Sequence, residues 1–512
     1  MNLGAAFRLA VNRYPDVTAI VTGKRKVSYR EWGQRVCAVA QGLARAGIQT
    51  GDRVAICAGS GELPATAFFA VHSLDAVAVM INTRWKSGDI AYALKDSCTK
   101  AVFYDAAARS ELHKIVDQFE DKLVFIADVP GGELQTWELS FSHLAEPASG
   151  QWPHIPQQGN ETGTILYTSG TTGRPKGVCR SPISDYFAAL AIILEHRWTR
   201  FERILAVMPL YHTMGLHTLI SQVLLNATAV IPEKAKPENY CKFLEAGQVS
   251  ALYLVPTMYH DLVEHVAGNR LPPIKKLAFA GAPMDSALQE TCRELFMPDT
   301  FINQYGCTEM IAITINDRLK QKPLSAGRTA LQSRIRIVGL EGFRQDRVLD
   351  TVCHGAVGEI LVDTTLPQAF LGYLGRREAS EHVLCNGWYF TGDLGFLDEE
   401  GDLFLAGRVD DMIISGGENI YPYEVEEILL KCHGVKEAAV VGAPDVRWGE
   451  RVVAFVVPTD RFLTKQQLER FVLHHPELAR FKRPREFILV QEIPKSPTGK
   501  VLRSLLKSDF EP

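Results

Sequence analysis

A run of glycine and hydroxyl residues follows a short apolar stretch and reads Thr168-Ser169-Gly170-Thr171-Thr172-Gly173-Arg174-Pro175-Lys176-Gly177. Residues 163–167, just before it, are typical of a β-strand. Glycines let the backbone turn tightly, while hydroxyl groups, free N–H groups and the Lys176 ammonium can surround phosphate oxygens. The run therefore predicts a phosphate-binding loop, with a simple flexible turn as the alternative. It is not a Walker loop, because Gly177 stands where that motif carries Ser or Thr.

Short β-rich runs alternate with helical periodicity on both sides of this loop. Apolar residues recur at helical spacing, for example, from Tyr29 to Ala46. Five runs are typical of buried strands: 53–57, 101–104, 204–208, 251–255 and 276–280. The alternation predicts an α/β fold with layered and largely parallel sheets, although periodicity alone does not give the strand order.

The length and the loops of the chain indicate how it divides into domains. Its 512 residues exceed one ordinary core, and a prior of about 150 residues per domain predicts two to four domains. The loop-rich stretch 146–162 is expected to link subdomains. From Gly355 onward short strands and turns dominate, and a separate unit is expected to begin near Arg408. We predict a large N-terminal domain of layered α/β subdomains over residues 1–407 and a small α+β domain over residues 408–512.

The composition excludes several classes of function. The net charge is −4, so no strong field of one sign exists to hold nucleic acid or an anionic membrane. The ten cysteines form no C-x-x-C unit, which argues against a zinc knuckle or a redox pair and suits a reducing cytosol. We read neither a signal peptide nor an apolar run of the ~18 residues that a membrane span needs. A cytoplasmic enzyme is therefore expected.

The glycine-rich loop and the motifs after it resemble the adenylate-forming superfamily. This superfamily includes acyl- and aryl-CoA synthetases, firefly luciferase and the adenylation domains of peptide synthetases. The motifs follow the superfamily's order across roughly residues 160–505, whereas the N-terminal third matches in general pattern only. The resemblance implies a mobile C-terminal domain, ATP and Mg²⁺ as cofactors, and coenzyme A as co-substrate. The implied reaction converts acid, ATP and CoA into acyl-CoA, AMP and pyrophosphate through an acyl adenylate.

The resemblance assigns nucleotide contacts to several motifs. In the motif 303–309, Tyr305 would stack on adenine, the Thr308 hydroxyl would contact the α-phosphate, and Glu309 would hold Mg²⁺, a cation that prefers carboxylate oxygen. Asp393 would accept hydrogen bonds from the ribose hydroxyls, as a charged acceptor suits a diol. The full predicted ATP and AMP set is Thr168, Ser169, Gly170, Thr171, Thr172, Gly173, Gly281, Ala282, Pro283, Tyr305, Asp393, Arg408 and Asn419. Cys307 is interpreted as a small wall residue, with a nucleophilic thiol as the alternative.

Two C-terminal motifs resemble the parts that exchange between half-reactions. Lys500, in the run 494–500, resembles the catalytic lysine of adenylation, and a solvated lysine is the alternative. Asp410 occupies the superfamily's hinge position. Gly416 and Gly417 would lie along the pantetheine tunnel, and rotation about the hinge would replace Lys500 by this glycine loop. The predicted catalytic residues are Lys500, Thr308, Glu309 and Lys176.

The segment 209–215 bears on the acid. Relatives that activate amino acids carry an aspartate where Thr213 stands, so the threonine argues against an amino acid. His212 is expected to shape the acyl pocket, with a core histidine as the alternative. The predicted acyl pocket consists of His212, Thr213, Met214, Gly306 and Met310. Resemblance to benzoate-type CoA ligases implies an aromatic acid, and a medium-chain or branched aliphatic acid remains open.

The thiol acceptor is interpreted from aromatic and basic residues near the C-terminus. Aromatic stacking on adenine and arginine on a phosphate would suit the CoA nucleotide, although the basic residues could be a solvated face. The predicted CoA-binding residues are Gly416, Gly417, Trp448, Phe481, Arg483 and Arg485. Loading of a carrier protein, a luciferase-like oxygenation and a non-enzymatic binding protein on the same scaffold are the competing readings. A homodimer is kept as one option for its assembly.

Overall fold

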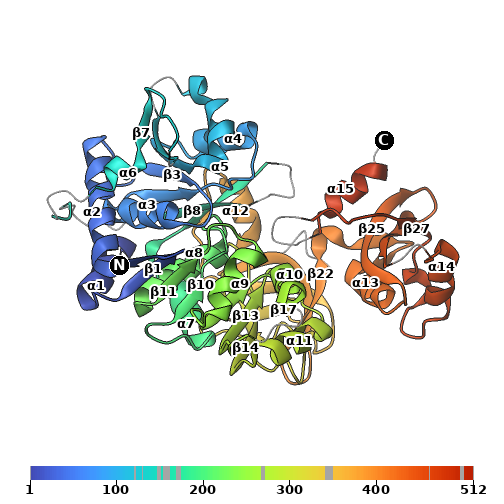
Figure 1. Ribbon diagram of the computed structural model, residues 1–512. Helices are drawn as coiled ribbons and strands as arrows, with labels where there is room; N and C mark the ends of the chain where they lie inside the picture. The colour runs from blue at the N-terminus through green and yellow to red at the C-terminus, as the bar shows by residue number, and fades with distance from the viewer. Residues whose placement is uncertain are drawn as a thin grey trace.

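Two large sheets of mainly parallel strands face each other across a layer of helices, as the computed structural model shows (Figure 1). The structure describes residues 2–119, 123–129, 131–146, 151–153, 162–168, 174–266, 271–340, 350–459, 462–495 and 501–510. Among these residues, no helix has the length and apolar character that crossing a bilayer requires. The α/β architecture predicted from the alternating pattern is confirmed.

The first large sheet carries the glycine-rich loop between two of its strands. Its order is β19-β9-β8-β4-β3-β5-β6-β7, parallel except where β9 pairs with β8 and β19. The bounds are β3 Arg53–Cys57, β4 Val77–Met80, β5 Ala101–Asp105, β6 Val124–Asp128, β7 Glu138–Ser140, β8 Thr164–Thr168, β9 Lys176–Arg180 and β19 Gly372–Tyr373. The strand predicted just before the loop is thus β8, and the loop joins an antiparallel pair.

The second large sheet has the order β16-β15-β14-β13-β12-β10-β11-β1-β2. Its bounds are β1 Thr18–Thr22, β2 Arg25–Ser28, β10 Arg203–Leu205, β11 Thr228–Ile231, β12 Ala251–Leu254, β13 Lys276–Ala280, β14 Thr300–Tyr305, β15 Thr314–Asn316 and β16 Arg328–Thr329. The strand predicted over 204–208 is shorter than expected. β10 ends at Leu205, and after one more ladder bond from Ala206 N–H the chain turns toward Pro209, which has no N–H to donate.

Helices pack between and outside the two sheets. Their bounds are α1 Leu3–Arg13, α2 Tyr29–Arg45, α3 Glu62–Ser73, α4 Ser87–Asp96, α5 Ala106–His113, α6 Phe141–Leu144, α7 Pro182–Glu195, α8 Thr213–Leu225, α9 Pro237–Glu245, α10 Pro256–Val266, α11 Ser286–Phe296 and α12 Arg377–Val383. α2 begins with a capping box in which Ser28 and Glu31 satisfy each other's backbone N–H groups. One apolar core joins α1, α2, α3 and α8 to strands of both sheets, so the sheets are held as one body.

An antiparallel sheet follows, with the order β17-β18-β21-β20 and β22 paired to β21. Its bounds are β17 Ile335–Val338, β18 Gly358–Asp363, β20 Leu384–Cys385, β21 Trp388–Leu397 and β22 Leu403–Arg408. The predicted domain boundary at residue 408 therefore falls on the last residue of β22. The boundary itself remains a prediction.

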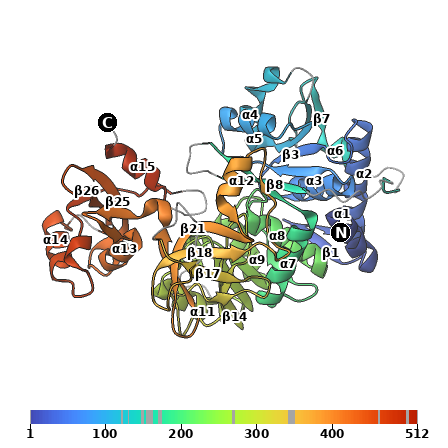
Figure 2. The same ribbon diagram turned by 180° about the vertical axis from the view of Figure 1, so that it is seen from behind.

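The C-terminal elements stand to one side of the rest in both views (Figures 1 and 2). Their bounds are β23 Ile413–Ser415, β24 Glu418–Ile420, α13 Pro422–Leu430, β25 Val435–Asp445, β26 Gly449–Pro458, α14 Lys465–His474, β27 Glu486–Leu489 and α15 Arg503–Lys507. Two apolar clusters drawn only from residues 413–506 form their core. This arrangement agrees with a small α+β unit after β22.

Candidate active site

The two ends of the glycine-rich loop lie side by side. Thr168 ends β8, Lys176 begins β9, and the two residues are direct partners across the antiparallel pair. Ser169, Gly170, Thr171, Thr172 and Gly173 lie outside the described residues, as does Lys500. Thr168 and Lys176 therefore mark where the chain leaves the first large sheet and where it enters it again.

Lys176 and Glu309 are brought together by a tyrosine that the sequence analysis did not single out. The Lys176 ammonium lies 5.4 Å from the centre of the Tyr373 ring. The Tyr373 hydroxyl donates a hydrogen bond to Glu309 Oε1 at 2.8 Å. Burial and the neighbouring Glu309 carboxylate raise the pKa of Tyr373, so its hydroxyl stays a donor. Tyr373 belongs to a two-residue strand, β19, whose shortness gives no periodic signal in the sequence.

A second cluster joins Tyr305, Asp393 and Arg408, all three of which were predicted to contact the nucleoside. Tyr305 Oη donates to Asp393 Oδ2 at 2.7 Å, and Arg408 Nη1 donates to Asp393 Oδ1 at 2.6 Å. Asp393 and Arg408 are also paired across β21 and β22. A carboxylate offers about four lone-pair sites, so Asp393 can accept further bonds from a diol.

Small residues lie at the carboxyl edge of the second large sheet. Ala280 ends β13 beside Gln304 of β14, so Gly281 and Gly306 follow adjacent parallel strands. Gly281 has a φ of +88°, a conformation that favours glycine. A Cβ atom on Gly306 would come within 2.0 Å of the Ile311 carbonyl oxygen, so no side chain fits there. Ligands of open α/β sheets bind at such carboxyl edges. Ala282 and Pro283 extend from the same edge.

The predicted acyl residues are divided between two apolar clusters. Met214, in the first turn of α8, packs with a group that includes Ala280 and Ile311. Met310 packs instead with a group that includes Phe370 and Tyr389. Thr213 is the first residue of α8. Ile311 was not singled out in the sequence, and its place beside Met214 follows from the turn between β14 and β15. The role of Met310 in the acyl pocket remains a prediction.

His212 is the residue before α8, and its ring is mostly enclosed. Burial and the positive charge of Arg84 lower the pKa of His212 to about 4, so the ring is neutral at physiological pH. Within the described part of the chain, its Nε2 atom is buried and has no hydrogen-bond partner. The role of His212 in shaping the acyl pocket remains a prediction.

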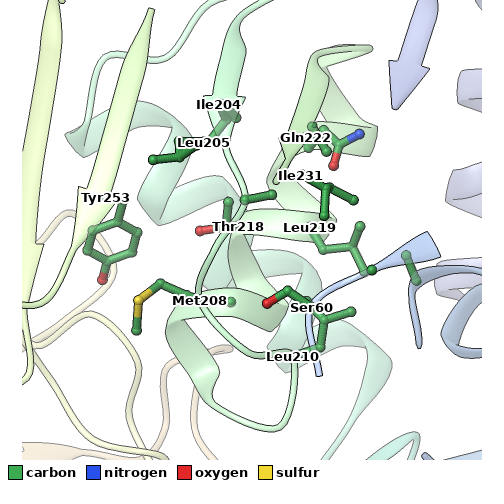
Figure 3. Close-up of a pocket in the computed structure, with 15 residues that line it drawn as sticks. Ser60, Ile204, Leu205, Met208, Leu210, Thr218, Leu219, Gln222, Ile231 and Tyr253 are labelled. Atoms are coloured by element: carbon green, nitrogen blue, oxygen red, sulfur yellow. The ribbon is translucent and has the colours of Figure 1, made fainter. Parts of the chain in front are cut away.

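A small cavity lies on the side of α8 that faces β10 and β11 (Figure 3). It has a volume of about 20 Å³, enough for one water molecule. Thr218 and Leu219 of α8 point toward it, and Tyr253 faces it from β12. Met208 and Gly215 also line it, so the cavity borders the segment 209–215 that was predicted to shape the acyl pocket.

The predicted nucleophile alternative for Cys307 is disfavoured by its surroundings. Burial, together with the charges of Glu309 and Asp393, raises the pKa of the Cys307 thiol well above its ordinary value. The thiol is therefore kept from forming the thiolate that nucleophilic catalysis needs. These surroundings favour the first interpretation of Cys307, a small wall residue.

Three of the residues predicted to bind CoA meet in the C-terminal part. The guanidinium groups of Arg485 and Arg447 lie 4.3 and 4.8 Å from the centre of the Trp448 ring. Gly416 N–H donates to the Trp448 carbonyl at 2.8 Å, and a Cβ atom on Gly416 would approach Trp448 Cε3 to 2.8 Å. Gly416 and Gly417 have φ values of +64° and +86°.

The other C-terminal predictions are more dispersed. Phe481 is exposed and lies on a 3-10 turn, Arg480–Lys482, followed by Arg483, whose buried Nε atom has no partner among the described residues. Asp410 lies in a second turn, Val409–Asp411, between β22 and β23. Asn419 is exposed in β24 and not in the Tyr305 cluster.

Known proteins that share this sequence pattern are AMP-binding enzymes and acid–CoA ligases. The family model for AMP-binding enzymes matches residues 7–374, and the model for the AMP-binding enzyme C-terminal domain matches residues 424–500. A 2-succinylbenzoate–CoA ligase of Listeria monocytogenes is 30% identical over 497 residues, which cover 96% of each chain. A long-chain-fatty-acid–CoA ligase of Mycobacterium tuberculosis is 30% identical over 520 residues, covering 99% of this chain and 98% of the relative.

Solved structures agree with these relatives. The o-succinylbenzoate CoA synthetase of Bacillus subtilis, in complex with ATP and magnesium ion, has a TM-score of 0.83 at 29% identity. The alignment covers 98% of this chain and 99% of that chain. Another structure of that synthetase holds an acyl-adenylate intermediate. Since the first family model spans well over half of the residues, the chain belongs to the family of AMP-binding enzymes.

Proposed function

We propose that the protein joins an aromatic carboxylic acid to coenzyme A, using ATP and passing through an acyl adenylate. The observation that carries the proposal is the meeting of Lys176 and Glu309 on Tyr373, together with the Tyr305–Asp393–Arg408 cluster. Tyr373 and Tyr305 pack against the same apolar group, so the two sets of residues are neighbours. The site would thus present cationic, metal-binding and ribose-binding groups to one nucleotide. Family membership and relatives that are acid–CoA ligases support the same reaction class.

The chemistry of the first half-reaction requires charge neutralisation more than proton transfer. A carboxylate is already ionised and needs no general base to attack the α-phosphorus of ATP. Both partners are anions, so positioning and electrostatic stabilisation must overcome their repulsion. Lys176 would offset phosphate charge, and the Thr308 hydroxyl would orient an α-phosphate oxygen. Lys500 would complete the site from the C-terminal part.

The residues fit a magnesium ion. Glu309 supplies an anionic oxygen, the ligand type that Mg²⁺ prefers beside substrate phosphates. The Tyr373 hydroxyl donates to one carboxylate oxygen of Glu309 and would orient the carboxylate that holds the ion. When bound there, Mg²⁺ would neutralise part of the phosphate charge. Asp393, kept in place by Tyr305 and Arg408, would accept hydrogen bonds from the ribose hydroxyls.

The second half-reaction would use the C-terminal part. Rotation about Asp410 would exchange Lys500 for the glycine pair at 416–417, where the absence of side chains leaves room for a thiol arm. Trp448 offers a face for adenine, and Arg485 and Arg447 offer charge for the CoA phosphates. An adenine ring would have to displace one of these guanidinium groups or share the tryptophan face with it.

The acid is proposed to be aromatic because the predicted acyl residues include an apolar cluster and a neutral histidine, and because relatives act on an aromatic acid. His212 is neutral, and Met214, Ala280 and Ile311 form one apolar cluster beside it. The 2-succinylbenzoate–CoA ligases act on an aromatic acid, as their name states. The long-chain-fatty-acid–CoA ligase among the relatives keeps an aliphatic acid as the second candidate.

A cytoplasmic location is part of the proposal. All ten cysteines are free, as expected for a protein in a reducing compartment. A homodimer remains a prediction from the sequence and can be tested by light scattering.

A panel of acids tests the proposed function. Benzoate, 4-chlorobenzoate, 2-succinylbenzoate and octanoate are each incubated with ATP, Mg²⁺ and CoA, and pyrophosphate release and product masses are recorded. We expect release that depends on the acid, with an aromatic acyl-CoA as the best product. Release with octanoate alone would favour the aliphatic candidate. No acid-dependent release across a wider panel would contradict the proposal.

A further inference from the structure

Three charged or ionisable residues form a fully buried chain beneath the candidate site. Arg180 ends β9, Asp185 lies in the first turn of α7, and His217 lies in the second turn of α8. Arg180 Nε donates to Asp185 Oδ1 at 2.6 Å, and His217 Nε2 lies 3.0 Å from the same oxygen. The side chains of all three are 0% exposed. We name these residues the Arg180–Asp185–His217 chain.

One end of the chain holds the backbone of two predicted catalytic residues. Arg180 Nη1 donates to the carbonyl oxygens of Thr308 and Glu309 at 3.1 and 3.2 Å. Its Nη2 donates to the carbonyl of Gln368 at 3.1 Å. Thr308 and Glu309 lie in the turn between β14 and β15 of the second sheet, whereas Arg180 belongs to the first sheet. The guanidinium group therefore fixes this turn from across the junction between the sheets.

The other end of the chain reaches the start of α8. His217 Nδ1 lies 2.9 Å from the carbonyl oxygen of Thr213, the first residue of that helix. A carbonyl only accepts, and an ionised Asp185 only accepts, so both ring nitrogens of His217 face acceptors. Thr213 belongs to the predicted acyl pocket. The chain thus runs from the acyl side of the site to the turn that carries Glu309.

Stability alone is a weak reason for such a chain. Buried ion pairs often add little or nothing to stability, because desolvation of the charges offsets their attraction. Burial would raise the pKa of Asp185, but Arg180 and His217 outweigh it and lower that pKa overall. Within the described residues, Asp185 Oδ2 is buried without a hydrogen-bond partner. What the chain does provide is a planar, forked donor that fixes three carbonyl groups at once.

We propose that Arg180, Asp185 and His217 are positioning residues that hold the Thr308–Glu309 turn and the first turn of α8 in one fixed relation for Mg·ATP and acid. This inference rests on the proposed function and deepens it. Groups that orient a metal-binding residue typically change metal affinity or activity by about 10–100-fold when mutated. The chain should therefore affect magnesium-dependent binding more than adenosine binding, which would use Tyr305 and Asp393.

Two substitutions in the full-length protein test the proposal. Arg180→Lys keeps a positive charge beside Asp185 but removes the fork that reaches the carbonyl groups of Thr308 and Glu309. His217→Gln removes the imidazole that bridges Asp185 and Thr213. Calorimetry measures binding of Mg·ATP and of adenosine. We expect R180K to weaken Mg·ATP binding about 10-fold and H217Q several-fold, each with less than a twofold change for adenosine.

A double variant and a matched control separate positioning from loss of stability. Since either substitution breaks the chain, R180K/H217Q should bind Mg·ATP within about twofold of R180K. Glu202→Gln removes another largely buried ion pair, with Lys276, at the amino ends of β10 and β13. That edge is opposite the site, so E202Q should lower the thermal midpoint and leave Mg·ATP binding unchanged.

Kinetics add a readout that a purely structural role would not produce. With the best acid of the panel, R180K should raise KM for Mg·ATP more than KM for the acid. His217 contacts Thr213 on the acyl side, so H217Q should raise KM for the acid at least as much as KM for Mg·ATP. Equal loss of kcat in both variants with unchanged KM values would contradict positioning.

Other results of the binding and folding measurements would overturn the positioning proposal or the proposed function. Folded variants that bind Mg·ATP within twofold of wild type would overturn the proposal, and so would lower thermal stability with unchanged binding. If R180K does not fold, H217Q alone carries the same prediction. If wild type itself binds no Mg·ATP, the proposed function fails, and the inference that rests on it fails with it.

Discussion

The nucleotide edge is the region formed by Lys176, Glu309, Tyr305, Asp393 and Arg408, and its carboxylates are held by hydrogen bonds. At Trp448 in the C-terminal part, two arginines stack on an aromatic ring instead. Asp393 is held by Tyr305 and Arg408 through hydrogen bonds of 2.7 and 2.6 Å. Arg447 and Arg485, in contrast, cover Trp448 and make no such bond to its ring. The first region is organised before its ligand arrives, which favours catalysis by fixed charges. At Trp448, the proposed adenine ring would displace a guanidinium group or share the tryptophan face with it.

Loss of Lys500 should produce the largest difference between the rates of the two half-reactions. Lys500→Ala is expected to reduce acyl-adenylate formation by about 100-fold or more, because a fixed charge near the reacting phosphate is removed. Thioester formation from supplied acyl-AMP should stay within a few-fold of wild type. Rapid-quench assays of each half-reaction measure both rates. An equal loss in the two assays would show that the lysine does not act in adenylation alone.

Asp393→Asn should impair the nucleotide edge with an effect of the next size. The change removes the charge that pairs with the largely buried Arg408, and a hydrogen bond to a charged group is worth about 1.5–3 kcal/mol. KM for ATP is expected to rise about 10–100-fold, whereas KM for CoA should change little. Steady-state kinetics, with circular dichroism to verify folding, give the comparison. A larger effect on CoA than on ATP would contradict the assignment.

Trp448→Ala should affect the C-terminal part and leave the nucleotide edge intact. Stacking of a base on an aromatic side chain is worth about 1–3 kcal/mol, so KM for CoA should rise about 10-fold. Pyrophosphate release in the absence of CoA should be unchanged. Trp388→Ala is a useful control, because Trp388 is likewise covered by two arginines but lies in the antiparallel sheet. If both substitutions raise KM for CoA equally, the CoA assignment of Trp448 fails.

The smallest expected effect is on the pH dependence of stability, through Glu359, which bonds to the residue before Asp393. Glu359 in β18 accepts a hydrogen bond from Gly392 N–H at 2.9 Å, and burial, with Asp393 nearby, raises the pKa of Glu359 from 4.5 to about 7. The folded state then binds this proton more tightly than the unfolded state. Its stabilising contribution is complete below pH 4.5 and is lost as pH rises toward 7.

Glu359→Gln removes that titration while keeping an acceptor for Gly392. The thermal midpoint of wild type should fall relative to that of E359Q as pH rises from 5 to 8. The difference in unfolding free energy should be of the order of 2–3 kcal/mol, from the size of the pKa shift. Scanning calorimetry of both proteins at the two pH values measures it. A constant difference would mean that Glu359 does not titrate in this window.

The sequence predicts strands well where apolar runs coincide with pairing. The run 276–280 predicts β13 to the residue, because both faces of this parallel strand are buried. The run 204–208 predicts too much strand, since residues 206–208 are apolar but only the first of them continues the ladder. Apolar composition reports burial, and it does not report which backbone groups pair.

The sequence predicts those site residues that belong to recognised motifs. It does not predict those that stand outside a motif. Tyr305, Asp393 and Arg408 meet, as the nucleoside motifs led us to expect. Tyr373 and the Arg180–Asp185–His217 chain had no such signal, because none of these residues belongs to one of the motifs recognised in the sequence. Arg180 and Thr308 are 128 residues apart, and only the junction of two sheets brings them together. Contacts of this kind depend on topology that local periodicity does not encode.

In the proposed reaction, acid and Mg·ATP react at the nucleotide edge before any thiol is needed. Exchange of labelled pyrophosphate into ATP, measured with the best aromatic acid and without CoA, is the decisive test. We expect rapid exchange that requires both acid and Mg²⁺ and is unaffected by Trp448→Ala. Exchange that appears only when CoA is added, or that does not depend on the acid, would contradict it.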